Sequence, residues 1–370
     1  MTPDRARALE LSEGLEATPK NIDRLSLAVG VEAARWAFTQ WELRDRAKTK
    51  FTRADRMLFD REGLEMASAE ELSDGVHTLG FPKGARVADL TAGIGGDLIG
   101  LSKNLDAVGL EIDQERAEIA RHNLGVCERT ASVRVEDCLA SDWDFDYAFA
   151  DPARRAGGRR TLDPSQFSPR LDLLFAKMQK IKFGRIKLSP MLNDEFLDSL
   201  SPDRVFVSHQ GECKEVLVHT GRKARDDKGL CGCWSFNAGD SEWLAGEVPL
   251  TEILDEPQEF VFEADPAVIR SHGLGNYGIA GLGESNGYLT ANEECFGLRK
   301  AYRALWHGPY RMKDIRYAAL DAGVRVAVVK TRGVDVDVQV VRRETDSGTG
   351  KPGVLLLYPV GRSVCAVLCE

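Results

Sequence analysis

The segment from Val87 to Asp97 constrains the fold more than any other stretch of this sequence. It has the pattern of a short apolar strand that ends in Asp89, followed by a glycine turn and a helix that opens with Asp97. The glycines of the turn are Gly93, Gly95 and Gly96. Glycine tolerates positive φ and carries no Cβ, so such a turn lets the backbone approach a ligand closely. The helix behind it presents unpaired N–H groups, and we therefore predict a nucleotide-type site here.

The spacing of these glycines argues against a dinucleotide. The dinucleotide-binding fingerprint needs a third glycine three positions after the second, so that a pyrophosphate can lie against the helix end. Counted from Gly95, that position is Leu98. The strand also ends in Asp89, and a carboxylate is badly suited to a pyrophosphate but well suited to a cationic amine.

Three further apolar strands follow, and each of them also ends in an acid. They are predicted at residues 107–110, 132–135 and 147–150, and the acids behind them are Glu111, Glu136 with Asp137, and Asp151. The carboxyl ends of parallel strands meet at the sheet edge where ligands of open α/β sheets bind. There Glu111 can accept hydrogen bonds from ribose hydroxyls and Asp137 from an adenine amino group. Each acid alone could instead be a helix cap or a turn residue, but four in this order favour a nucleoside site.

This arrangement resembles the class I S-adenosylmethionine-dependent methyltransferases. The resemblance implies a doubly wound, Rossmann-like α/β sheet and S-adenosylmethionine as cofactor, with Asp89 facing the methionine amine. The cofactor-binding residues that it implies are Ser68, Asp89, Thr91, Ala92, Gly93, Gly95, Gly96, Asp97, Glu111, Ile112, Asp137 and Asp151.

The family resemblance can be narrowed. Residues 58–71 look like the lead-in segment of trimethylguanosine-synthase-like RNA methyltransferases, where a Thr-Pro-Glu-like element wraps the cofactor; here Ser68-Ala69-Glu70 lacks the proline. Nearly the whole chain resembles bacterial methyltransferases with a C-terminal THUMP-like domain. The matching segments are residues 88–97, 149–155, 187–190, 211–212 and 330–335. THUMP domains are associated with RNA, chiefly transfer RNA, so this resemblance implies an RNA substrate.

At 370 residues the chain is long enough for several structural parts. We predict a helical N-terminal extension over residues 1–75, a methyltransferase domain over 76–248 and an α+β THUMP-like domain over 249–370. Within the last part, strands are predicted at residues 259–262, 324–330, 354–358 and 363–368, and a glycine-rich loop at 273–287. A charged loop is predicted at residues 222–229.

Composition excludes several other classes. No apolar run approaches the roughly twenty residues that span a bilayer, and the first residues lack the order of a secretory signal. Eight scattered cysteines are typical of reduced thiols, and Cys231 and Cys233 have neither redox nor zinc spacing. We therefore expect a cytoplasmic protein with no membrane association and no metal. The sequence does not determine the oligomeric state.

Asp151 opens the candidate catalytic motif, Asp151-Pro152-Ala153-Arg154. An amine that attacks the cofactor's methyl group gains positive charge, which the Asp151 carboxylate would stabilise while Pro152 holds the turn rigid. Arg154 could stack on a flipped base or hold a phosphate. Amino-methyltransferases usually have a second proline and an aromatic residue in this motif, and both are absent here. Lys187 ends the next strand, where a lysine more often extends from the sheet edge into solvent than lies near substrate.

Basic residues gather in the C-terminal part, although the net charge of the chain is −9. They are Arg299, Lys300, Arg303, Arg311, Lys313, Arg316, Arg325, Lys330, Arg332, Arg342 and Arg343. This excess, with the basic loop Arg154–Arg160, suggests a phosphate-bearing partner. We predict a methyltransferase that modifies a base in RNA (tRNA or rRNA). The alternatives are a non-catalytic RNA-binding protein with the same fold, or a methyltransferase that acts on protein, DNA or a small molecule.

Overall fold

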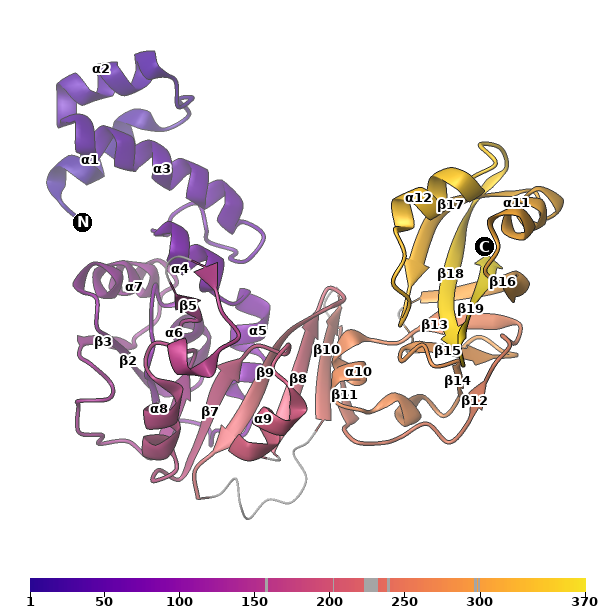
Figure 1. Ribbon diagram of the computed structural model, residues 1–370. Coiled ribbons are helices and arrows are strands. Elements are labelled where there is room, and N and C mark those ends of the chain that lie inside the picture. The colour runs from indigo at the N-terminus through magenta and orange to yellow at the C-terminus, as the bar shows by residue number, and fades with distance from the viewer. Residues whose placement is uncertain (157–158, 202, 223–231, 238–239, 296–297, 299) are drawn as a thin grey trace. The chain divides into compact units, whose positions relative to one another are not determined.

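A computed structural model describes the chain apart from residues 157–158, 202, 223–231, 238–239, 296–297 and 299 (Figure 1). The chain divides into two compact units. The first contains residues 1–203 and 217–228, and the second contains residues 204–216 and 229–370. The domain boundaries after residues 75 and 248 stay predictions. In the described part of the chain, no helix is long and apolar enough to cross a membrane.

Three helices begin the first unit: α1 (Pro3–Ser12), α2 (Pro19–Val29) and α3 (Val31–Ala47). The threonines before α1 and α2 cap these helices through their hydroxyls, and a proline occupies each first turn. Ala34 and Phe38 are buried in the core between these helices, where Trp41 packs at the margin. The predicted helical character of this segment is confirmed.

The first unit also holds the parallel strands that surround the glycine turn. They are β1 (Arg86–Asp89), β2 (Asp106–Glu111), β3 (Ser132–Val135), β4 (Tyr147–Ala150) and β7 (Phe183–Leu188). Strand β1 pairs with β2 on one side and with β4 on the other, and β3 and β7 follow outward. The strand order therefore reverses at β1, and ligands of open α/β sheets bind at such a switch point.

The other helices and 3-10 turns of this unit precede β1 or connect the strands along the chain. They are α4 (Arg61–Met66), α5 (Glu70–Asp74), η1 (Val76–Thr78), α6 (Gly96–Leu101), α7 (Gln114–Val126), η2 (Pro164–Gln166), α8 (Leu171–Met178) and α9 (Asp194–Leu200). Two short strands, β5 (Arg155–Ala156) and β6 (Arg159–Arg160), pair with each other. Gly157 and Gly158 of the predicted basic loop lie outside the described residues.

Four more strands extend this sheet, which is not wholly parallel as predicted. They are β8 (Arg204–His209), β9 (Glu212–Thr220), β10 (Gly232–Asn237) and β11 (Asp240–Ala245), and the sheet order is β11-β10-β8-β9-β7-β4-β1-β2-β3. Strand β10 is parallel to β8 but antiparallel to β11. Short apolar runs do not reveal whether the next strand turns back, so sequence periodicity missed this hairpin. Of the predicted loop at 222–229, residues 223–229 lie outside the described residues.

The second unit contains an eight-stranded sheet in the order β12-β14-β15-β13-β16-β19-β18-β17. Its strands are β12 (Ile253–Leu254), β13 (Phe260–Glu263), β14 (Ala280–Leu282), β15 (Tyr288–Ala291), β16 (Lys300–Pro309), β17 (Val324–Thr331), β18 (Lys351–Val360) and β19 (Ser363–Cys369). The four predicted strands of this part are confirmed. The glycine-rich stretch 273–287 is not wholly a loop, because it contains η4 (Leu274–Tyr277) and β14.

Helices α10 (Pro266–Arg270), α11 (Met312–Asp321) and α12 (Val338–Thr345) complete the second unit. Helices α11 and α12 both lie against strand β17 (Figure 1). Ile315 of α11 and Val341 of α12 pack with Leu355 and Leu357 of β18, whereas Leu356 lies in a separate core cluster. The alternation of β18 side chains thus gives both faces of this sheet an apolar core. The sequence analysis did not predict α11 or α12, and valines in α12 favour strands by propensity.

Candidate active site

The glycine turn has the backbone conformation that its sequence predicted. Gly93 has φ +53° and Gly95 has φ +89°, the region that glycine adopts most readily. A Cβ at Gly95 would lie 3.3 Å from the Cα of Ala120, so packing also requires glycine there. A Cβ at Gly93 would meet nothing closer than 3.9 Å. The backbone at Gly93 therefore borders open space, whereas Gly95 lies against helix α7.

Glu111, at the end of β2, holds this turn in place. Its Oε2 accepts a hydrogen bond from the backbone N–H of Gly93 (2.8 Å) and its Oε1 accepts one from that of Asp113 (2.9 Å). Ala92 is buried and donates its N–H to the carbonyl of Leu110 (2.9 Å). The next residue after Glu111, Ile112, is 69% exposed. The ends of β1 and β2 thus form one connected edge with an apolar side chain beside it.

Thr91 links the end of β1 to the end of β4. Its N–H donates to Asp89 Oδ1 (3.1 Å), and its Oγ1 accepts from the N–H of Asp151 (2.7 Å). Asp89 is buried, and its Oδ2 has no hydrogen-bond partner among the described residues. Burial and the neighbouring charge of Asp97 raise the pKa of Asp89 well above its usual value. This carboxyl is therefore poised to gain from a cation placed against it.

Lys187 occupies the centre of a second cluster, and the expectation that its ammonium extends into solvent is wrong. Its side chain is 7% exposed, and its Nζ lies 2.5 Å from Asp151 Oδ2 and 3.7 Å from Asp97 Oδ2. The same Nζ donates to Ser68 Oγ (2.7 Å). On the other side of Asp97, His77 Nδ1 lies 2.8 Å from Oδ1. Buried carboxylates around the lysine provide the counter-charges that allow a cation to be buried.

The two acids that contact Lys187, Asp97 and Asp151, have pKa values shifted in opposite directions. For Asp97, burial would raise the pKa, but Lys187 and His77 outweigh burial and the pKa lies well below its usual value. For Asp151, burial outweighs the opposing effect of Lys187, and the charge of Asp97 adds to it, so the pKa of Asp151 is raised. Of the two carboxyls, Asp151 is thus the one that takes up a proton more readily.

The remaining predicted site residues lie around this core. Pro152 is buried and Arg154 is half-buried, and the positive charge of Arg154 favours the ionised form of Asp151 by lowering its pKa. Gly96 begins α6, and Asp97 follows it. Asp137 is exposed, and its Oδ1 accepts from the N–H of Leu139 (2.8 Å), which is the turn role that the alternative interpretation gave to such acids.

Sequence reasoning missed His77 completely. It is fully buried in η1, and its ring lies 4.9 Å from that of Phe149, centroid to centroid. No local motif surrounds His77, and its partner Asp97 is twenty positions away. Only the packing of η1 against α6 brings the two together.

Comparisons with known proteins agree with this architecture. Residues 300–370 match the family model described as THUMP domain-like. The chain is 26% identical over 372 residues to an uncharacterized S-adenosylmethionine-dependent methyltransferase found in two strains of Mycobacterium tuberculosis, and the match covers 92% of this chain and 98% of that protein. A crystal structure from Porphyromonas gingivalis W83, assigned as a methyltransferase, superposes with a TM-score of 0.75 at 18% identity, covering 99% of this chain and 98% of the other.

The fold, the C-terminal domain and the nearly full-length similarity lead to one classification. The chain has the fold of the class I methyltransferases, is similar over nearly its full length to an S-adenosylmethionine-dependent methyltransferase, and has a THUMP-like domain at its C-terminus.

Proposed function

We propose that this enzyme methylates a nitrogen atom of a base in RNA, with tRNA or rRNA as the substrate. The observation that carries the proposal is the partly buried carboxylate of Asp151 directly after β4, joined through Thr91 to the end of β1. A base nitrogen that accepts a methyl group becomes cationic in the transition state, and a nearby carboxylate stabilises that charge. Asp151 would also receive the proton that this nitrogen then releases, which suits its raised pKa.

The residues at the sheet edge fit S-adenosylmethionine, which when bound supplies an electrophilic methyl group on sulfur. Asp89 has a buried oxygen without a partner, and the cofactor's amine is the cation that we assign to it. The open space at Gly93 admits the methionine portion, and Glu111 would bind the ribose. Exposed Ile112 offers an apolar surface for the adenine, and Asp137 would accept from its amino group. We assign the remaining cofactor contacts to Ser68, Thr91, Ala92, Gly95, Gly96, Asp97 and, beside its catalytic role, Asp151.

The substrate side of the site rests on the motif after β4. Buried Pro152 fixes the direction of the chain behind Asp151, so the carboxylate is held without the second proline of related motifs. Arg154 is half-buried beside that carboxylate. A guanidinium in this place can stack on a base that is flipped out of its strand, in place of the missing aromatic ring. Alignment of the base with the methyl group would then supply much of the rate enhancement.

The basic residues of the second unit differ in their availability to RNA. Arg303 and Arg325 are paired with Glu259 (3.4 Å) and Asp346 (3.5 Å), and Lys330 is paired with Glu263. Lys313, Arg316 and Arg342, by contrast, form no ion pair with any residue that the structure describes. Arg299 lies outside the described residues. We therefore assign phosphate contacts first to the exposed face of α11, which carries Lys313 and Arg316.

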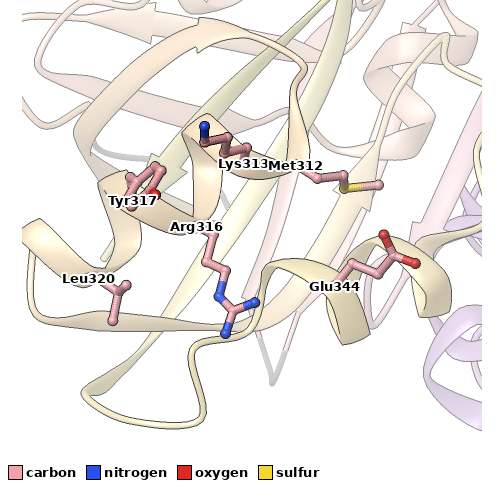
Figure 2. A pocket seen from close by; sticks show the side chains of 6 residues that line it. All are labelled: Met312, Lys313, Arg316, Tyr317, Leu320 and Glu344. Atoms are coloured by element: carbon pink, nitrogen blue, oxygen red, sulfur yellow. The ribbon is translucent and has the colours of Figure 1, made fainter.

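A pocket of about 350 Å³ accompanies these cations on α11. Figure 2 shows its lining, in which Glu344 from α12 joins residues of α11, namely Met312, Lys313, Arg316, Tyr317 and Leu320. Tyr317 is 61% exposed, and the ammonium of Lys313 lies 5.8 Å from the centre of its ring. Unpaired RNA bases stack on exposed aromatic rings while nearby cations hold the backbone. This combination favours a nucleic acid over a protein or small-molecule substrate, and the THUMP-like domain favours RNA among nucleic acids.

The substitution Asp151→Asn tests the catalytic assignment. Because the amide keeps the shape but loses the charge, we expect transfer of labelled methyl groups to RNA to fall by about 100-fold or more. S-adenosylmethionine binding, measured by calorimetry, should change only a few-fold. The control is Asp146→Asn, which removes an exposed carboxylate paired with Lys182 just before β4 and should leave activity unchanged.

Three results would contradict the proposal in different ways. Full activity of the Asp151→Asn variant would remove Asp151 from the catalytic centre. RNA binding by the native enzyme without methyl transfer to any RNA class would favour the non-catalytic alternative. Methyl transfer to a protein, to DNA or to a small molecule, with weak and salt-insensitive RNA binding, would favour the third alternative. Nucleoside profiles of RNA from cells with and without the protein would identify the modified base.

A further inference from the structure

Lys187 is the buried cation nearest to the proposed catalytic carboxylate, and the function proposed above gives it no task. It lies on the same face of β7 as Phe183 and Arg185, since side chains alternate along a strand. Its Nζ lies 2.5 Å from Asp151 and hydrogen-bonds to Ser68, in the segment between α4 and α5. One ammonium group thus connects the end of β4 with the segment that we assign to the cofactor.

We propose that Lys187 is a positioning residue that keeps Asp151 ionised and fixes its carboxylate toward the methyl-accepting nitrogen, while its bond to Ser68 ties this carboxylate to the cofactor-side segment. This inference rests on the proposed function, because it assigns Asp151 to the substrate nitrogen. It adds a residue that the motif after β4 does not contain.

The charges around Asp151 explain why a cation is needed there. Burial and the carboxylate of Asp97 both disfavour an ionised Asp151. Asp89 is a second buried acid linked to Asp151 through Thr91. The basic groups that face these acids are Lys187, Arg154 and, through Asp97, the imidazole of His77. Lys187 lies within ion-pair distance of Asp151, with 2.5 Å between Nζ and Oδ2, so its removal should favour the protonated form of Asp151.

The proton balance of the reaction agrees with this role. The nitrogen gains a bond to the methyl carbon while the carbon–sulfur bond breaks, and the bonding electron pair stays on sulfur. The nitrogen then releases one proton, and an ionised Asp151 can accept it. A protonated Asp151 can neither stabilise the cationic nitrogen nor accept this proton. Lys187 keeps its own protons throughout, since they are used in the hydrogen bond to Ser68 and the ion pair with Asp151.

The test compares Lys187→Met with Lys187→Arg in the full chain, with kcat/KM for RNA methylation followed from pH 5.5 to pH 9.5. In the Met variant, we expect the acidic limb of the pH profile to move upward by at least about one pH unit, so that activity falls about tenfold at pH values below the native limb and recovers as the pH rises above the shifted limb. The Arg variant keeps the charge, and its acidic limb should stay in place. The matched control is Lys182→Met, which breaks the exposed ion pair with Asp146 and should leave the profile unchanged.

A second measurement separates this inference from the proposed function. The carboxyl ¹³C resonance of Asp151, followed with pH, reports its pKa without any substrate, and we expect a higher midpoint in the Met variant than in the native protein. An unchanged midpoint, or an unchanged pH profile, would overturn the role of Lys187 even if RNA is methylated. If RNA is not methylated but the midpoint rises, the proposed function fails and the electrostatic role stands. If Lys187→Met does not fold, Lys187→Gln is used, because it removes the charge and can still hydrogen-bond to Ser68.

Discussion

Asp97 and Asp89 are both almost completely buried, yet their pKa values move in opposite directions. The difference lies in their partners. Asp97 contacts a lysine and a histidine, whereas one oxygen of Asp89 has no partner among the described residues. A buried charge is stable only when it is paired, so Asp97 acts as a structural anchor for Lys187 and His77. Asp89 instead remains available for a cation from outside the chain.

We predict that Asp97→Asn lowers the free energy of unfolding by about 3–5 kcal/mol, because it removes one of the two counter-charges of the buried Lys187 ammonium and the charged partner of His77. The wild-type contribution also depends on pH. The pKa of Asp97 is lower in the folded chain than its reference value of 3.8, so its stabilising effect is present above that value and is lost as the pH falls toward the folded pKa. Urea unfolding between pH 3 and pH 7 should therefore show a steeper acid loss for the native chain than for the variant.

The control for this prediction is Asp172→Asn. Asp172 forms a hydrogen-bonded ion pair with Arg170, but both side chains are more than half exposed. Exposed pairs contribute little because water screens them, so the loss of unfolding free energy should be much smaller than for Asp97→Asn. Similar losses in the two variants would show that the cluster around Lys187 does not anchor the site.

At the scale of elements, α5 and α6 are in very close contact. Helix α6 carries the glycine turn at its start, and α5 follows the segment that contains Ser68. Gly100 faces the backbone of α5, and a Cβ there would lie 2.2 Å from the carbonyl carbon of Ser73. The absence of a side chain at Gly100 therefore sets the distance between the two assigned cofactor-binding segments.

We predict opposite effects for the same substitution at two helical glycines. Gly100→Ala should lower the free energy of unfolding by about 1–3 kcal/mol, because the two backbones must separate. Gly125→Ala, in α7, should raise it by up to about 1 kcal/mol, since a Cβ there meets nothing within 4 Å and alanine favours the helix. Thermal unfolding monitored by circular dichroism gives both values. A stabilised Gly100→Ala variant would contradict the close packing of α5 on α6.

For the molecule as a whole, charge is distributed unevenly along the chain: the net charge is negative, but the C-terminal part is basic. The net charge is −9, yet residues 300–370 contain twelve lysines and arginines against seven aspartates and glutamates. Several of these cations form ion pairs within the second unit, so fewer unpaired positive charges are available at the surface than the sequence suggests. An acidic chain with one basic region would bind a polyanion in a preferred orientation.

We predict that Arg316→Gln weakens RNA binding and lowers its dependence on salt. Loss of one phosphate contact should reduce the slope of log Kd against log salt concentration by about 0.7 for single-stranded RNA. Arg303→Gln is the matched control, because Arg303 is paired with Glu259 and the same charge change should affect the slope less. Fluorescence anisotropy with a labelled RNA at several salt concentrations measures both. Equal salt slopes for the native chain, Arg316→Gln and Arg303→Gln would argue against RNA binding at the α11 surface.

The sequence by itself determined the local features of this protein. The glycine turn, the acids behind β1, β2, β3 and β4, and the helix caps near the N-terminus depend on residues adjacent in the chain, and the structure contains each of them. The similarity to methyltransferases was visible at this level because the motif Val87–Asp97 is contiguous. The turn contact of Asp137 is also local, since it reaches only to Leu139.

Only the tertiary structure decided which polar and charged groups lie close enough to form hydrogen bonds and ion pairs. Ser68 and Lys187 are separated by 119 positions, and His77 and Asp97 by 20, so no local pattern could pair them. The direction of β11 and the helices α11 and α12 were likewise settled by packing. The physical reason is that burial and pairing of charge depend on distance in space, whereas turn geometry and strand periodicity depend on neighbours along the chain.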